Sequence, residues 1–213
     1  MKYPAAFPSK QGLYDPRHEH DACGIGFVAH IKGQRSHGIV QQALDVLVCL
    51  DHRGARGAEP NTGDGAGILM QIPDRFLREE MTTAGVELPP AGQYGVGMVY
   101  LPRIHASHRH FCEQAFGEIV EDEGQYLLGW RDVPTDNNSI GMWAQSHEPV
   151  MRQVFIKQSA NIAGGDAEAQ LLAFERKLYV IGKRASHEIR HSDEEEGDAF
   201  YLSSLSCRTI VYK

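Results

Sequence analysis

Apolar residues along this chain recur at strand spacing in some stretches and at helix spacing in others. Residues 24–31 alternate between larger apolar side chains and small or polar ones, a period of two that predicts a strand. Ser36 then suits a helix cap, and apolar residues between 39 and 50 follow helical spacing until Arg53-Gly54 interrupts them. A polar, glycine-rich loop continues to Asp64.

The two stretches 66–72 and 94–101 are apolar or small at almost every position. Such a uniform pattern is typical of strands covered on both faces rather than of an open antiparallel sheet. A short helix is predicted over 75–81 and a longer one over 107–121, and strand character resumes at 153–158.

The longest helix is predicted to begin at Asp166. Apolar residues from 167 to 181 recur at alternating steps of four and three, which predicts one buried stripe over several helical turns. An acidic connection follows at 191–198, and the final stretches 199–205 and 208–212 again predict strands. Mixed strands and helices, with some strands buried on both faces, indicate the α+β class with two sheets between layers of helices.

Composition restricts the class of protein. With 213 residues, of which 42% are hydrophobic and 23% charged, the chain is ordinary for one globular domain. A net charge of -7 without any Lys and Arg cluster argues against a nucleic-acid partner, and no apolar run is long enough to span a membrane. The four cysteines are widely spaced and form no C-x-x-C pair, which disfavours a zinc ribbon or disulfide framework and favours the reducing cytoplasm.

Cys23 is the first candidate for chemistry, because it lies between a polar, proline-containing leader and a stretch rich in small residues. If the bond between Ala22 and Cys23 were cut, the new α-amine, with a pKa of about 8, could serve as general base for the thiol beside it. The residues alone leave a second interpretation open, in which Cys23 is a structural thiol at the start of a strand.

The turn that contains Arg53 and the glycine loop after it are open to two interpretations as well. A positive charge near Cys23 would favour the thiolate, but an arginine at the end of a helix also interacts favourably with the helix dipole. The run Gly63-Asp64-Gly65-Ala66-Gly67 has the wrong spacing for a dinucleotide fingerprint and opens a strand rather than a helix. We expect its glycines to provide positive φ in a tight turn beside the Cys23 strand.

Histidines raise the question of a metal site. His187-Glu188-Ile189-Arg190-His191 matches the H-E-x-x-H pattern of zinc hydrolases, in which Glu188 would be the general base. No histidine follows His191 as a third ligand, which favours a solvated helix end. For the three histidines before and within the helix at 107–121 we expect a wet helix face rather than a metal shell: His105, His108 and His110.

Three stretches carry a family resemblance: HDACGIGFVAHIKG at 20–33, ALDVLVCLDHRGARGAEPNTGDGAGILMQIP at 43–73, and FYLSSLSCRTIVYK at 200–213. In this order they resemble the glutamine amidotransferase domain of glutamate synthases. The resemblance implies a four-layer αββα sandwich of the N-terminal nucleophile hydrolase type, incomplete at the C-terminus. It also implies a propeptide at 1–22 that is removed in maturation, followed by the front part of the domain at 23–213.

The activity implied by the resemblance is hydrolysis of L-glutamine to glutamate and ammonia for transfer to 2-oxoglutarate, the ammonia-assimilating route to glutamate. Cys23 would be the nucleophile and, through its free amine, the base, and Arg53 matches the arginine that supports the nucleophile. The groups that grip the substrate are expected beyond Lys213, so the chain alone should have little or no glutaminase activity.

The same resemblance implies no cofactor in this chain, and FMN with an iron–sulfur cluster in the full-length protein. The implied partners are L-glutamine, the remaining synthase domains of the polypeptide and a small reductase subunit, with neither nucleic acid nor membrane. Two other functions remain open from the residues: a non-catalytic interaction module of the same fold, and a zinc hydrolase that uses His187, Glu188 and His191.

Overall fold

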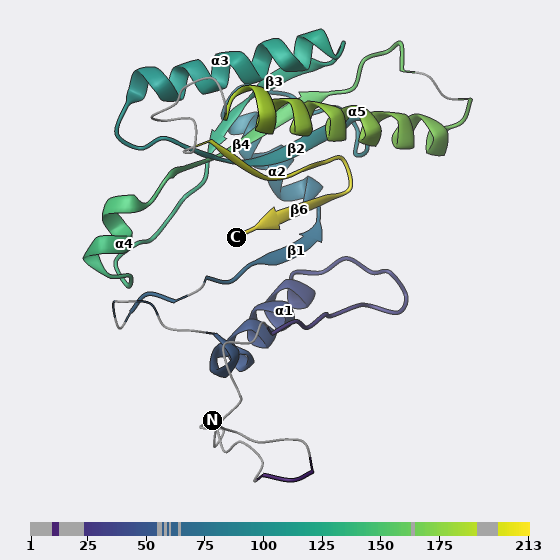
Figure 1. Cartoon of the computed structure of the whole chain (residues 1–213). Coiled ribbons are helices and arrows are strands. Elements are labelled where there is room, and N and C mark those ends of the chain that lie inside the picture. The colour runs from purple at the N-terminus through teal and green to yellow at the C-terminus, as the bar shows by residue number, and fades with distance from the viewer. Residues whose placement is uncertain are drawn as a thin grey trace. The chain divides into compact units, whose positions relative to one another are not determined.

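The computed structural model describes residues 10–12, 24–54, 57, 59, 61–63, 65–162, 165–190 and 200–213 (Figure 1). The chain divides into two compact units. The first unit comprises residues 1–68, 138–145 and Lys213, and the second comprises residues 69–137 and 146–212. Cys23, His191 and the acidic segment 191–198 lie outside the described residues.

The second unit is built on a four-stranded antiparallel sheet. Its strand order is β3-β4-β2-β5, with β2 at Tyr94–Leu101, β3 at Tyr126–Asp132, β4 at Val150–Lys157 and β5 at Tyr201–Ser206. β2 pairs with β4 along its whole length, and its pairing with β5 shifts register between Met98 and Val99. β2 is therefore a central strand with a hydrogen-bonded neighbour on each side.

Helices α3 (Ala106–Asp122) and α5 (Ala167–Glu188) cover one face of this sheet (Figure 1). Val99 and Leu101 of β2 enter the same apolar core as Phe116 of α3 and Leu178 of α5. Asp166 begins α5 as its N-cap, since its Oδ1 accepts a hydrogen bond from the Ala169 N–H over 2.8 Å. Both predicted long helices are thus confirmed.

The opposite face of the sheet packs against α2 (Asp74–Thr83) and a two-stranded sheet of β1 (Ile68–Gln71) and β6 (Thr209–Tyr212). The core on this side joins residues of β2 and β4 to residues of α2 and β6: Tyr94, Val96, Phe155, Leu77, Met81 and Ile210. Every residue of β2 is buried as a result. The predicted coverage of 94–101 on both faces is confirmed, although the sheet is antiparallel.

The same prediction is wrong for 66–72. β1 alternates between half-buried and exposed residues, and Leu69 is 67% exposed. The reason is that, among the described residues, β1 pairs with β6 alone, in a sheet that packs against the rest of its unit on one side. The apolar composition of β1 therefore does not mean that both of its faces are buried.

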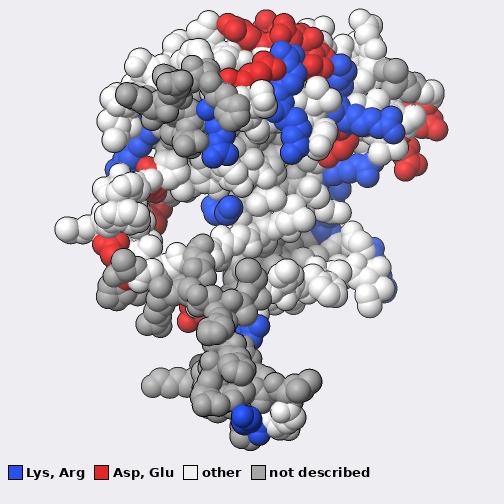
Figure 2. Space-filling model, in the orientation of Figure 1, with Lys and Arg blue, Asp and Glu red and all other residues white. Residues whose placement is uncertain are grey.

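Ion pairs join the C-terminal end of α3 to the middle and the C-terminal part of α5. Lys177 Nζ lies 3.0 Å from Glu123 Oε2, and Arg184 contacts both Glu123 and Asp122, at 3.1 and 3.2 Å. The hydrogen bond from Lys177 is the main reason that the pKa of Glu123 lies below its usual value. Figure 2 shows acidic and basic side chains interleaved over these two helices.

The first unit contains helix α1 (His37–Cys49), followed by the 3-10 turn η2 (Asp51–Arg53) that ends at Gly54. This agrees with the predicted helix and its end. Ser36 occupies the N-cap position, but its side chain makes no capping hydrogen bond.

The predicted strand over 24–31 is wrong. Residues 24–30 form no helix, strand or turn, and 31–32 form a turn. The three large apolar side chains of the stretch are almost fully exposed: Ile25 at 92%, Phe27 at 91% and Ile31 at 103%. A strand requires hydrogen bonds from a neighbouring strand, and none of the described residues provides them to this stretch.

Two elements were not predicted at all, β3 and the short helix α4 (Met142–His147). β3 is irregular, because its register against β4 shifts between Leu127 and Gly129, and Gly129 has a φ of 153°. The predicted strand at 153–158 is confirmed as β4, which begins at Val150. The described part of the chain is a mixed α/β structure with antiparallel sheets, and none of its helices is long and apolar enough to cross a membrane.

Candidate active site

Arg53 lies in a turn that is held by hydrogen bonds at each step. Its backbone N–H donates to Leu50 O over 2.8 Å, and the Gly54 N–H donates to Asp51 O over 3.2 Å. The Nδ1 of His52 lies 2.9 Å from the Cys49 carbonyl oxygen at the end of α1. The path of the chain through Arg53 is therefore set by α1, and the side chain of Arg53 is half-buried.

The two glycines that follow Cys23 lie against α1. A Cβ placed on Gly24 would come within 2.8 Å of Leu50 Cδ2, and one on Gly26 within 2.4 Å of Val46 Cγ1. Any larger residue at Gly24 or Gly26 would force the segment away from the helix, so these glycines permit the close approach. The residue next to Cys23 in sequence thus contacts Leu50, the residue at which the turn with Arg53 begins.

The loop between η2 and β1 is closed on itself. The Gly57 N–H donates to Thr62 O over 2.7 Å, and the Thr62 N–H donates to Glu59 O over 3.1 Å. Gly65 has a φ of 91°, so the predicted positive φ is confirmed for this one glycine of the run at 63–67. Asp64 and the expected strand partner at Cys23 lie outside the described residues.

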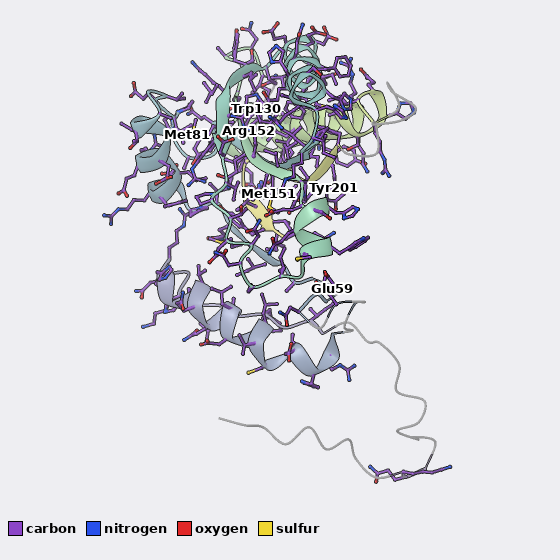
Figure 3. All side chains as sticks on the ribbon, turned by 90° about the vertical axis from the view of Figure 1, so that its left-hand side faces the viewer. Glu59, Met81, Trp130, Met151, Arg152 and Tyr201 are labelled. Atoms are coloured by element: carbon purple, nitrogen blue, oxygen red, sulfur yellow. The ribbon has the colours of Figure 1, made fainter. Side chains whose placement is uncertain are left out.

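Glu59 connects this loop to a distant segment of the first unit, an arrangement that the sequence did not predict (Figure 3). Its Oε1 accepts a hydrogen bond from the Trp143 N–H over 3.0 Å, and its Oε2 accepts from the Ala144 N–H over 3.2 Å. Thr62 Oγ1 donates to Oε2 over 3.2 Å. The hydrogen bond from Trp143 is the main reason that the pKa of Glu59 is lowered, so the carboxylate is ionised at neutral pH.

The H-E-x-x-H motif is only partly within the described residues. His187 and Glu188 form the last turn of α5, and His191 lies outside. Glu188 Oε1 accepts a hydrogen bond from Arg184 Nε over 2.8 Å, so the carboxylate that would act as general base is engaged in an ion pair.

The prediction that the histidines near α3 are exposed to solvent is wrong for His108. This residue is only 9% exposed, and its ring stacks on Phe111 with the centroids 5.9 Å apart. His105 and His110 are exposed, as expected. Among the described residues, no group of three or more His, Cys, Asp or Glu is arranged to hold a metal ion.

Cys207 is a buried thiol at the turn between β5 and β6. Its Sγ and its backbone N–H both donate to Glu175 Oε2 over 2.9 Å, and Ser206 Oγ donates to Glu175 Oε1 over 2.5 Å. Burial, with the hydrogen bond to Glu175 as a second cause, raises the pKa of Cys207 to about 12. Because the thiolate is the nucleophilic form, Cys207 is unsuited to nucleophilic catalysis.

Comparison with known proteins identifies the class. Residues 23–213 match the family model for class II glutamine amidotransferases, and the chain belongs to this family. The match confirms the resemblance carried by the stretches at 20–33, 43–73 and 200–213.

The relatives are more specific. "Glutamate synthase [NADPH] large chain" of Bacillus subtilis is 48% identical over 206 residues, which are 97% of this chain and 13% of that protein. "Glutamate synthase [NADH]" of Schizosaccharomyces pombe is 41% identical over 98% of this chain, and "Ferredoxin-dependent glutamate synthase 2" of Synechocystis is 36% identical over 92%. The matches cover 10% and 12% of the last two, so the chain spans about a tenth of the length of these relatives.

Proposed function

We propose that this chain performs the glutaminase step of a glutamate synthase, releasing ammonia from L-glutamine for addition to 2-oxoglutarate elsewhere in a longer polypeptide. Membership of the class II amidotransferases supports the first half of this proposal. The names of the three relatives above support the second half.

The observation that carries the proposal is the contact between Gly24 and Leu50. Cys23 is bonded to Gly24, and Arg53 follows Leu50 within a single tight turn. A positive charge on Arg53 would favour the thiolate of Cys23. We infer that Cys23 is the nucleophile and Arg53 its supporting charge.

The chemistry requires a free amine on Cys23, so we propose that residues 1–22 are removed as a propeptide. The amine takes the thiol proton, and the thiolate attacks the side-chain carbonyl of glutamine to form a tetrahedral oxyanion. The protonated amine then gives its proton to the departing ammonia, which leaves a thioester. Water, deprotonated by the same amine, hydrolyses the thioester to glutamate and regenerates the thiol.

The finer architecture that we propose is the four-layer αββα sandwich. It is supported by the helix layer of α3 and α5, the four-stranded sheet, and the two-stranded sheet on the opposite face. We also propose that FMN and an iron–sulfur cluster belong to the rest of the longer polypeptide, as expected for a glutamate synthase. A small reductase subunit and a cytoplasmic location complete the proposal.

Mass spectrometry of the full-length polypeptide tests the proposal. We expect a mature N-terminus at Cys23 and a single covalent adduct at Cys23 after treatment with a diazoketone analogue of glutamine. Cys23→Ala should abolish both the adduct and glutamine hydrolysis, while Cys49→Ala, which removes an exposed thiol, should change neither. Retained residues 1–22 in an active enzyme, or an adduct at another cysteine, would refute the assignment.

A further inference from the structure

Glu59 is the one carboxylate in the described part of the loop between η2 and β1, and its contacts reach beyond the loop. Its two oxygens accept hydrogen bonds from two consecutive backbone N–H groups, those of Trp143 and Ala144. These donors lie more than 80 positions away in sequence, yet they belong to the same compact unit. A carboxylate that accepts several N–H groups makes charge-assisted hydrogen bonds, which are stronger than neutral ones.

The position of the Glu59 carboxylate also requires that residue 141 has no side chain. A Cβ at this position would come within 2.1 Å of Glu59 Oε2 and 2.3 Å of its Cδ. The three nearest atoms to that Cβ all belong to Glu59. Gly141 therefore leaves the space that the carboxylate occupies, and Glu59 and Gly141 form a matched pair.

The same carboxylate organises the loop that it comes from. Thr62 donates its hydroxyl to Glu59 Oε2 and its N–H to the Glu59 carbonyl, while its own carbonyl accepts from Gly57. Gly57 lies four positions after Arg53, at the start of the loop closure. The contacts of Glu59 and Thr62 thus hold Gly57, four positions after Arg53.

We propose that Glu59 is a positioning residue of the glutaminase site, which fixes Gly57 and Thr62, and through them Arg53, against the segment Gly141–Ala144. This inference rests on the proposed function of Cys23 and Arg53. Glu59 itself touches neither substrate nor reacting atoms. Its effect is to keep the guanidinium at the nucleophile, so its loss lowers the thiolate fraction of Cys23.

The test compares four forms of the full-length polypeptide: wild type, Glu59→Ala, Gly141→Ala and the double variant. We expect each single change to lower kcat/KM for glutamine about tenfold or more, with the larger part in kcat. Because Gly141→Ala acts only by displacing the Glu59 carboxylate, it should have almost no further effect in the Glu59→Ala background. Glu87→Gln, which alters an exposed glutamate in the loop after α2, is the matched control and should leave kcat/KM unchanged.

Two further measurements separate positioning from a general loss of structure. The rate of Cys23 alkylation by iodoacetamide, followed against pH, should shift to higher pH in Glu59→Ala, because the thiol loses its supporting charge. Glu59→Gln, which retains one accepting oxygen, should restore part of the activity. Hydrogen exchange at Trp143 and Ala144 should accelerate in Glu59→Ala while exchange in β2 does not change.

The outcomes are distinguishable from those of the proposed function. Faster exchange with an unchanged kcat/KM and alkylation profile would overturn the positioning role and leave Cys23 as the nucleophile. Effects of Glu59→Ala and Gly141→Ala that multiply in the double variant would also overturn it, since the two residues would then act independently. A wild-type protein whose Cys23 does not react would overturn the proposed function, and the positioning role with it.

Discussion

The side-chain amide of Gln153 donates a hydrogen bond to the hydroxyl oxygen of Tyr212 over 2.9 Å. Gln153 is fully buried in β4, and its Oε1 accepts a hydrogen bond from Arg131 Nη1 over 3.1 Å. Arg131 in turn pairs with Glu80 of α2 at 2.5 Å. A chain of polar contacts therefore runs from α2, by way of β3 and β4, to β6. On the face of the sheet that α3 and α5 cover, Arg152 lies over the Trp130 ring, 5.7 Å from its centroid (Figure 3).

Tyr212→Phe should destabilise the fold by about 1 to 3 kcal/mol, because it leaves a buried donor of Gln153 without its acceptor. Urea unfolding of this chain at neutral pH measures the change. Tyr126→Phe removes a hydroxyl from a tyrosine that is 56% exposed and should change stability by less than about 0.5 kcal/mol. Equal effects of the two substitutions would contradict the importance of the Gln153 contact.

Gly95→Ala should destabilise the second unit, because its Cβ would lie 2.6 and 2.8 Å from the two methyl carbons of Leu178. Overpacking of this kind costs about 1 to 3 kcal/mol. Gly117→Ala is the matched control in α3, where the nearest atom would be 3.4 Å away and alanine favours the helix by up to about 1 kcal/mol. Thermal unfolding should therefore show a lower Tm for the first variant and an equal or higher Tm for the second.

Glu123 should make stability depend on pH in the acidic range. Its pKa is lowered in the folded state, chiefly by the hydrogen bond from Lys177, so its stabilising effect is complete above the usual value of 4.5 and is lost as pH falls through the lowered pKa. Glu123→Gln should cost about 1 kcal/mol at pH 7 and progressively less below pH about 4. Unfolding by urea between pH 3 and 7 checks this, with the exposed Glu121→Gln as control. A difference that does not shrink in acid would refute the ion-pair explanation.

Cys207 should be almost inert to alkylation in the folded chain. Because its pKa is about 12, the thiolate fraction of Cys207 at pH 8 is smaller, by a factor on the order of 10³, than that of a thiol with the usual pKa of 9.0. The exposed Cys49 should react before Cys207 in a timed iodoacetamide reaction followed by peptide mass spectrometry, and Cys207 should react only after unfolding. Rapid labelling of Cys207 without unfolding would show that Glu175 and burial do not protect it.

Arg53→Ala in the full-length polypeptide should lower kcat/KM for glutamine about tenfold or more, since a rise of one unit in the thiol pKa removes nine-tenths of the thiolate. Arg53→Lys should retain part of the activity because the charge remains. Arg75→Ala, at an arginine whose side chain is 93% exposed, is the control and should have no effect. The alkylation rate of Cys23 against pH provides a second readout, and an unchanged profile in Arg53→Ala would exclude the supporting role.

Local pattern was sufficient for the elements whose residues carry strong periodicity. The stripe after Asp166 became α5, the uniform stretch 94–101 became β2, and the last two apolar stretches became β5 and β6. Each of these follows from spacing within a single segment. β3 was missed because its bulge at Gly129 interrupts the alternation, and the strand expected over 24–31 has no partner among the described residues.

The sequence by itself determined the family, Cys23 and Arg53 as candidate residues, and most of the helices and strands of the second unit, because these depend on neighbouring residues or on short motifs. Only the tertiary structure decided that β2 pairs antiparallel with β4 and β5, that Gly24 lies against Leu50, and that Glu59 binds the backbone at Trp143. Each of those contacts joins segments that are distant along the chain. Their partners are determined by packing and hydrogen-bond geometry in three dimensions, about which local periodicity contains no information.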